Sequence, residues 1–293
     1  MELALQLFSI VAPVFVCGAI GFTWARLDLP FDGKSISALV LNVGLPCLIF
    51  HALVSIELSM EEFGEMVKVS LVYFAIIGAV AAAILKATKR SVRTFLPSIL
   101  VPNGGNLGLP ICLFAFGDKG LVLGVTFFAI LLLIQSTVGI AIAVGGVSLT
   151  MLVTTPIFYS VALAVIVMAT DFEVPLSVAR TIELIGGFPV PVMLIALGVS
   201  LAGFKVSLLG NSLLVALIRL GLGYVVGVGI AWYFELGHVM AGVLILQAVM
   251  PVAVMSYMLE LRFGRDPESI AGAVVISTLL SIAILPLVLA SVL

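Results

Sequence analysis

Apolar residues run along this chain in ten windows of about 20 residues, the length of helix that crosses a hydrocarbon layer ~30 Å thick. The windows are 3–25, 35–56, 64–86, 93–116, 120–145, 149–169, 178–202, 207–233, 239–262 and 268–291. Helix-start signals fall between them: Ser59 and Glu62 form a capping box, and Asp266 precedes Pro267 as an N-cap precedes a first-turn proline. The pattern predicts an all-α polytopic membrane protein with ten transmembrane helices.

The fourth window is interrupted at residues 101–110, V-P-N-G-G-N-L-G-L-P. Proline lacks a backbone N–H and clashes with the preceding turn, and glycine weakens the helix that remains. At membrane depth an opened backbone survives only where protein buries it or where it lines a cavity. We therefore expect Pro102, Asn103 and Asn106 to face a ligand. The alternative role for the two amides is to satisfy freed backbone groups.

Prolines also recur between the two halves of the chain, at separations of 143, 145 and 149 residues. The pairs are Pro13 with Pro156, Pro46 with Pro191, and Pro102 with Pro251. We therefore expect two five-helix repeats, residues 1–146 and 147–293. Because five is odd, the second repeat enters the membrane with inverted topology. Helices four and nine are then equivalent, so their broken segments should cross.

Composition and the distribution of charge indicate that the chain lies in a membrane and predict its orientation there. Hydrophobic residues make up 63% of the 293 residues and charged residues 10%, and the net charge of -2 gives no sign of a nucleic-acid surface. Nine Lys and Arg fall in connections that share one side when the N-terminus is outside, against three in the others. Both termini should then face outward. Cys17, Cys47 and Cys112 lie singly in apolar windows, which predicts neither a disulfide framework nor a metal site.

Further polar residues mark candidate contacts near the breaks. Asn42 and Ser55 flank Pro46, and Gln247 stands four residues before Pro251, where it either caps the broken helix or contacts ligand. We expect these residues, with Pro251 itself, to belong to the substrate site. His51, four residues before Ser55 on the same helical face, is expected to be a hydrogen-bonded packing residue.

Arg219 is the base nearest the middle of an apolar window. A charge at that depth is costly, which makes it a functional hypothesis by default. We expect it to form a structural ion pair with Glu183 or Glu260. The alternative is that Arg219 faces the cavity as the counter-charge of an anion.

Four segments resemble the auxin efflux carrier family: L-N-V-G-L-P-C-L-I-F-H at 41–51, the interrupted segment 101–110, F-G-D-K-G at 116–120 and L-Q-A-V-M-P at 246–251. The resemblance implies a ten-helix homodimeric transporter, with a scaffold part and a transport part in which the fourth and ninth helices cross. It implies substrates such as auxin, malonate, malate or lactate. It also places Gln135 where a family glutamine faces the substrate, although interhelical hydrogen bonding would equally retain a glutamine there.

Two departures from the family pattern matter. Val252 replaces the polar residue that usually follows the proline of helix nine. The long hydrophilic loop of many plant PIN carriers is absent, which fits a bacterial-type member in the cell (inner) membrane.

These observations predict a secondary transporter that moves small organic anions, mono- or dicarboxylates, by alternating access. The alternatives are a sodium-coupled symporter of larger organic anions, or a channel or sensor on the same fold. No enzyme is expected, since the aspartates fall in connections or at helix ends and H-E-x-x-H and G-x-S-x-G are absent. No cofactor is expected, and coupling to Na+ or H+ stays open: Asn103, Asn106 and Gln135 offer oxygens to Na+. Proton coupling would need Glu183 or Glu260 to turn inward.

Overall fold

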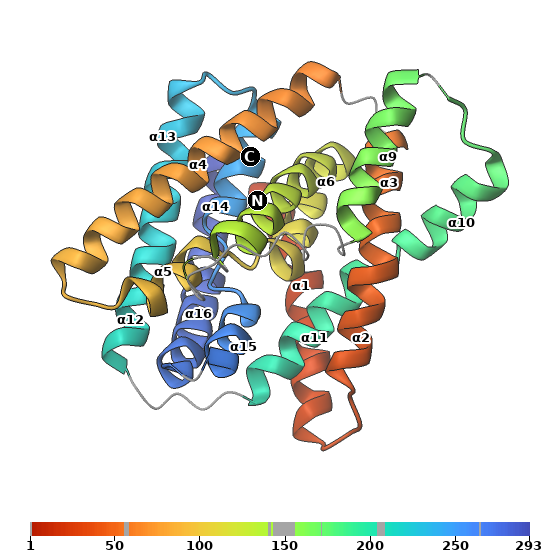
Figure 1. Cartoon of the computed structure of the whole chain (residues 1–293). Coiled ribbons are helices and arrows are strands. Elements are labelled where there is room, and N and C mark those ends of the chain that lie inside the picture. The colour runs from red at the N-terminus through yellow and green to blue at the C-terminus, as the bar shows by residue number, and fades with distance from the viewer. Residues whose placement is uncertain are drawn as a thin grey trace.

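The computed structural model describes residues 2–55, 59–139, 142, 156–170, 172–203, 209–263 and 265–293, and these residues form helices without a strand element (Figure 1). The α-helices are α1 (Glu2–Arg26), α2 (Gly33–Leu39), α3 (Leu45–Ser55), α4 (Met60–Ala87), α5 (Val92–Leu100), α6 (Leu109–Ile134), α9 (Pro156–Thr170), α10 (Leu176–Gly186), α11 (Pro189–Gly203), α12 (Leu209–Leu217), α13 (Gly223–Tyr233), α14 (His238–Ala248), α15 (Val254–Phe263) and α16 (Pro267–Val292). Short π-helical turns join some of them: η1 (Val40–Gly44), η2 (Gly104–Gly108), η3 (Gln135–Gly139) and η4 (Ile218–Leu222).

The predicted polytopic membrane protein is confirmed. In the described part of the chain, seven helical segments are long and apolar enough to cross a membrane, although one of them, Gly104–Val138, is bent at Gly117; Pro156–Thr170 and His238–Ala248 are shorter apolar helices. Each of the ten predicted windows contains at least one helix. The expected boundary between the two repeats, 146/147, lies outside the described residues.

The predicted helix starts are present. Ser59 Oγ accepts a hydrogen bond from the Glu62 N–H at 3.1 Å, and the Glu62 carboxylate accepts one from the Ser59 N–H at 3.2 Å. Asp266 Oδ1 accepts one from the Ser269 N–H at 3.1 Å and so caps α16. Asp32 caps α2, and the hydroxyl and backbone hydrogen bonds from Ser35 lower the pKa of its exposed carboxyl.

The fourth and fifth windows separate inside α6, at the place the sequence predicts. Gly117 adopts a φ of 63° there, in the left-handed region that favours glycine. After this turn the helix folds back on itself and brings Gly120 against Cys112. A Cβ on Gly120 would lie 2.4 Å from the Cys112 carbonyl oxygen, so only glycine fits there. The element is therefore a tight hairpin of two antiparallel arms.

The helices pack into two groups, on the right and left of Figure 1 with α6 between them. In the flanking group (α1, α2, α3, α9, α10 and α11), α1 packs along α11, and α3 packs on α9 and α10. In the crossover group (α4, α5, α6 and α12 to α16), α4 packs on α5 and α6, α6 on α14, and α12 and α15 on α16. Each group draws on both halves of the chain, so the packing does not follow the expected repeat boundary.

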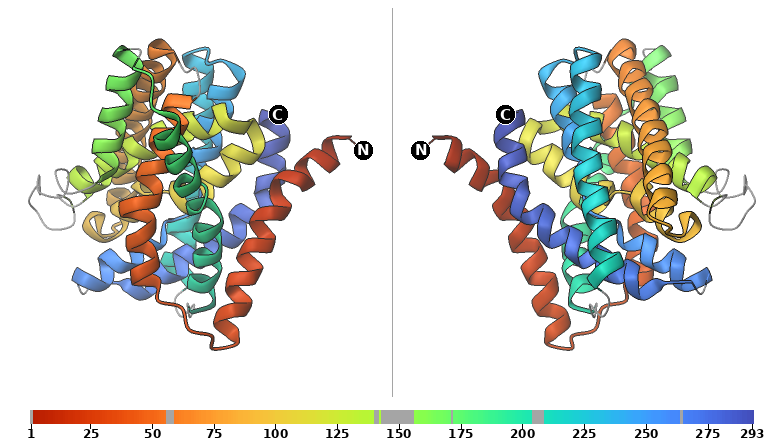
Figure 2. Two further views of the ribbon diagram at one scale, coloured as in Figure 1. Left: turned by 90° about the vertical axis from the view of Figure 1, so that its right-hand side faces the viewer. Right: turned by 90° about the vertical axis from the view of Figure 1, so that its left-hand side faces the viewer.

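Connections at opposite ends of the molecule carry different polar contacts. At one end, Arg90 hydrogen-bonds to Asn211, and Arg265 Nη1 donates to the Arg93 carbonyl at 2.8 Å. At the other end, Lys119 Nζ lies 2.6 Å from Glu62 Oε1. Figure 2 shows α1 along one edge of the bundle, and the free ends of α1 and α16 lie on the same side of the molecule. Connections at alternate ends of the molecule are what helices that run back and forth through a membrane produce.

The contact between α1 and α11 depends on small residues, since a Cβ on Gly198 would lie 2.0 Å from the Gly18 carbonyl oxygen. We expect Gly198→Leu to lower the free energy of unfolding by about 1–3 kcal/mol through overpacking. Reversible unfolding in mixed detergent micelles measures this. Gly203→Leu on the same helix is the control, because its Cβ would meet nothing within 4 Å. Equal losses in both variants would contradict the proposed contact.

Candidate ligand-binding site

The two interrupted segments meet and pair backbone to backbone. The Asn103 N–H donates to the Pro251 carbonyl at 2.7 Å, and the Ala253 N–H donates to the Val101 carbonyl at 3.2 Å. Pro102 stands opposite Val252 in an antiparallel bridge. The expected crossing is therefore confirmed, and each break satisfies backbone groups that the other break leaves open.

Side chains from neighbouring helices complete this pairing. Ser277 Oγ on α16 accepts a hydrogen bond from the Val252 N–H at 3.0 Å. The Val252 side chain is fully buried and is not among the cavity-lining residues described below. The apolar replacement noted in the sequence therefore removes no donor from the cavity.

Arg219, on η4, does not have the partners that the sequence analysis expects. It is 0% exposed, its Nη1 donates to the Ile99 carbonyl at 2.6 Å, and its Nη2 donates to the Tyr73 hydroxyl at 2.6 Å and to the Ala248 carbonyl. Glu183 is exposed on α10, and Glu260 instead lies near Arg265. The expected ion pair is therefore wrong: hydrogen bonds to carbonyl groups, not to a carboxylate, hold this charge.

The position of Arg219 explains why a charge is retained there. Ile99 lies in the last turn of α5 and Ala248 ends α14, so one guanidinium binds the C-terminal ends of both helices that lead into the crossing. Helix C-termini carry partial negative charge, which a buried cation offsets. The Tyr73 hydroxyl also donates to the Ala248 carbonyl, at 3.3 Å.

Two helix N-termini at the crossing border a cavity of about 270 Å³. The crossover group lines it with Val101, Pro102, Asn103, Gly105, Asn106, Phe128, Leu131, Leu132, Gln135, Ser136, Ala253, Val254 and Met255. The flanking group lines it with Ile36, Ser37, Val40, Leu41, Asn42, Leu45, Pro156, Ile157, Val192, Met193 and Ala196. The cavity thus lies between the two groups, and its described lining contains no Lys, Arg, Asp or Glu.

Five of the eight residues expected at the substrate site line this cavity: Asn42, Pro102, Asn103, Asn106 and Gln135. Asn103 is 4% exposed, and its Nδ2 has no hydrogen-bond partner among the described residues. Asn42 instead donates its amide to the Ala38 carbonyl at 2.8 Å. Asn103 is therefore the lining residue with a buried donor that is free to bind a ligand.

The other three expected residues lie outside the cavity lining. Ser55 forms a 3.2 Å hydrogen bond with His51 Nδ1 at the end of α3. The Pro251 carbonyl is used in the backbone pairing. Gln247 is fully buried behind the break, with Nε2 3.5 Å from the Gly104 carbonyl, and a Cβ on Gly108 would lie 2.3 Å from its Oε1. Gln247 therefore supports the break from the side away from the cavity.

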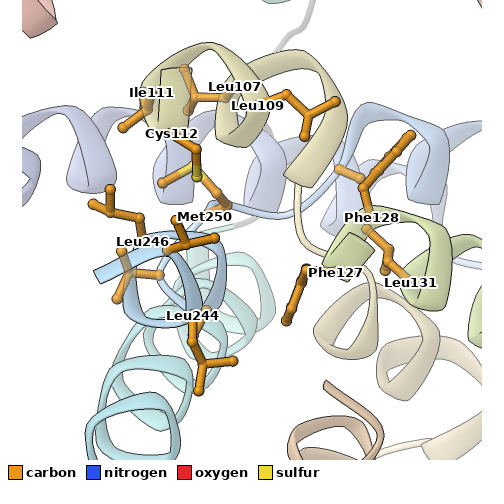
Figure 3. Close-up of a cluster of buried hydrophobic side chains, with 14 of the residues drawn as sticks. Leu107, Leu109, Ile111, Cys112, Phe127, Phe128, Leu131, Leu244, Leu246 and Met250 are labelled. Carbon is orange, nitrogen blue, oxygen red and sulfur yellow. The ribbon is translucent and has the colours of Figure 1, made fainter. Parts of the chain in front are cut away.

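Apolar packing holds the first arm of α6 in place around the crossing. Figure 3 shows side chains of η2 and that arm facing α14 and the break after it, with the second arm of α6 alongside. The residues of this cluster include Leu107, Leu109, Ile111, Cys112, Phe127, Phe128, Leu131, Leu244, Leu246 and Met250. A side chain would not fit at Gly105, because its Cβ would lie 2.8 Å from the Phe128 ring.

The sequence analysis assigns no role at the site to two residues that support it. Tyr73 and Ser277 are fully buried and bind the two sides of the crossing. Their sequence signal is a polar group in the middle of an apolar window, which at that depth must find a partner. That signal does not identify the partner.

A family model described as membrane transport protein matches residues 7–144 and 139–289. The chain belongs to this membrane transport protein family. An uncharacterized transporter of Methanothermobacter thermautotrophicus is 25% identical over 268 residues, which cover 87% of this chain and 88% of that protein. The family assignment confirms the resemblance to auxin efflux carriers, and it makes the crossing and its cavity the natural place to look for transport chemistry.

For this membrane transport protein we expect Arg219→Gln to destabilise the fold by about 3 kcal/mol or more, because two helix-end carbonyls lose a charged donor. Tyr73→Phe should cost about 1 kcal/mol, the value of one hydrogen bond. Thermal unfolding in detergent measures both, with the exposed Arg180→Gln as control. A normal melting temperature for Arg219→Gln would show that this charge does not hold the crossing together.

Proposed function

We propose that this protein is a secondary transporter of small organic anions, of the mono- or dicarboxylate class, that works by alternating access. The observation that carries the proposal is the direction of the helices at the crossing, where N-terminal ends border the cavity. The η2 turn begins after Asn103 without a side-chain cap, and α15 begins at Val254, so two helix N-termini border the cavity. The free N–H groups of such ends attract anions.

The binding chemistry fits an anion that must also be released. Asn103 Nδ2 is a buried, unpartnered donor, and Asn106 and Gln135 place further amides on the cavity wall. These donors are neutral, so they bind a carboxylate without the strong pairing that a lysine or arginine would form. The apolar remainder of the lining suits the carbon skeleton of the substrate.

The packing supports alternating access. The cavity has one wall from the crossover group and one from the flanking group. The hydrogen bonds that hold the crossing are internal to the crossover group, so this group is able to move against the flanking group without exposing the paired backbone. Such a movement would open the cavity to the two sides of the membrane in turn.

The finer architecture belongs to the same proposal: ten spans in two inverted repeats, residues 1–146 and 147–293, in a homodimer in the cell (inner) membrane. The reciprocal hydrogen bonds between residues 101–103 and 251–253 support the repeat, since two equivalent segments related by a two-fold axis pair in this way. Coupling to Na+ and a channel or sensor function are the alternatives.

Both termini are expected outside, because the basic connections should lie in the cytoplasm. In a variant that lacks the three native cysteines, Ser291→Cys should react with an impermeant maleimide in intact cells, whereas Lys89→Cys should be protected until the cells are opened. Both positions are exposed in the structure. The opposite labelling pattern would reverse the orientation.

Counterflow in proteoliposomes tests the function, with radiolabelled malonate, malate, lactate and indole-3-acetate offered in turn. We expect saturable counterflow of at least one of them. Conductance without counterflow would indicate a channel, and binding without flux would indicate a sensor.

Asn103→Ala should weaken apparent affinity or transport about tenfold or more, roughly one hydrogen bond to a charged group. Asn103→Asp should be worse, because it sets a carboxylate against an anionic substrate. Asn211→Ala, which lies outside the cavity lining, is the control. Wild-type kinetics in both Asn103 variants would place the binding site elsewhere.

A further inference from the structure

Neither Glu183 nor Glu260 turns into the described cavity lining, so a proton bound at Glu260 would act on the cavity from outside it. Glu260 lies on α15, is 0% exposed, and neither of its carboxylate oxygens has a hydrogen-bond partner among the described residues. In folded proteins a buried carboxylate is normally hydrogen-bonded or fully paired. A buried carboxylate without a hydrogen bond is a functional hypothesis in a membrane transport protein.

Among the described side chains, Arg265 forms an ion pair with Glu260. Arg265 Nη1 lies 3.6 Å from Glu260 Oε1, beyond hydrogen-bond length, and the same nitrogen donates to the Arg93 carbonyl at 2.8 Å. Asp266 stands beside the pair: its side chain caps α16, and its backbone N–H lies close to the Glu260 carboxyl without forming a regular hydrogen bond. On the helices that pack against α15, the other charged residues near this end are Arg93 on α5 and the exposed Glu268 on α16.

Two buried hydroxyls on the same neighbouring helices also lack partners. Ser98 Oγ on α5 and Ser269 Oγ on α16 have no hydrogen bond in the described part of the chain. In the described part of the chain, an ionised Glu260 would therefore have the 3.6 Å contact with Arg265 as its charged compensation. A neutral carboxylic acid fits these surroundings better, because an ionised one would have no hydrogen bond among the described residues to compensate for its lost hydration.

We propose that Glu260 is the proton-binding site that couples transport to the proton gradient. In the conformation seen here the acid carries a proton on one carboxylate oxygen. In the opposite conformation that proton passes to water and leaves the carboxylate. Only an O–H bond forms and breaks, and no electrons are transferred. The inference rests on the proposed transport function.

The link from Glu260 to the substrate cavity runs along two helices. Val254 begins α15 at the cavity, and Glu260 lies six residues further on, about 9 Å along the helix axis. When Glu260 ionises, Arg265 gains a better partner than the Arg93 carbonyl, and its shift loosens the contact between the far ends of α15 and α5. Helix α5 ends at the crossing and α15 begins there. The change of partner by Arg265 therefore biases the position of the crossover group.

Proteoliposomes with the membrane potential clamped at zero test the coupling, with radiolabelled malonate and lactate as probes. For one proton per anion, a gradient of one pH unit, acid outside, should accumulate the probe about tenfold in wild-type vesicles. Glu260→Gln should abolish this accumulation and keep counterflow, since the amide mimics the neutral acid. Glu268→Gln, an exposed acid at the start of α16, should behave as wild type.

Two results of this experiment would overturn the inference: acid-driven accumulation in Glu260→Gln equal to that of wild type, or accumulation that follows a sodium gradient and ignores the pH gradient. Absence of counterflow in the wild type would instead count against the transport function itself. The two failures are therefore distinguishable.

Infrared titration tests proton binding without any substrate. The C=O stretching band of a buried neutral carboxylic acid should be present in the wild type and absent in Glu260→Gln. The midpoint of its titration should move to higher pH in Arg265→Gln, because the guanidinium favours the ionised carboxylate. If Glu260→Gln fails to fold, the Arg265→Gln shift decides the matter. An unmoved midpoint, or a band that Glu260→Gln leaves unchanged, would overturn the proposal.

Discussion

Backbone groups that no helix satisfies are the constraint on which this structure depends. Two segments open at membrane depth, and neither is stable there alone, because each leaves N–H and carbonyl groups without partners. The crossing solves both problems at once, through the Asn103 to Pro251 and Ala253 to Val101 hydrogen bonds. Arg219 then binds the carbonyl ends of α5 and α14, which the crossing itself does not reach.

The same arrangement separates charge across the crossing. Arg219 binds the partly negative carbonyl ends of α5 and α14, and the partly positive N-terminal ends of η2 and α15 border the cavity. An anion-attracting cavity therefore arises without a basic side chain in its described lining. This suits the proposed transport of an anion, which must bind and also leave. Arg219 contributes by offsetting the partial negative charge of the α5 and α14 ends.

The helix packing gives the crossing a rigid setting within a divided molecule. Tyr73, Arg219, Gln247 and Ser277 all bind or support the crossing from helices of the crossover group. The flanking group meets this unit through α1 and α3, which pack on α6, and through cavity-lining apolar residues such as Val192 and Met193. A relative movement of the groups costs few polar contacts, whereas a movement within the crossover group would cost many. Glu260 lies at the far end of α15, where a change of charge acts on the crossing without touching the substrate.

The sequence by itself determined the membrane class, the places where helices begin and break, and the polar residues at the first break, because hydrophobic windows, capping residues and prolines act over a few neighbouring positions. Five of the eight expected site residues consequently line the cavity. Only the tertiary structure decided the partners of Arg219, the position of Gln247 behind the break, and the grouping of helices from both halves of the chain. A polar residue in an apolar window indicates that a partner is needed. The identity of that partner depends on which helices pack together, because many distant side chains could satisfy the same local requirement.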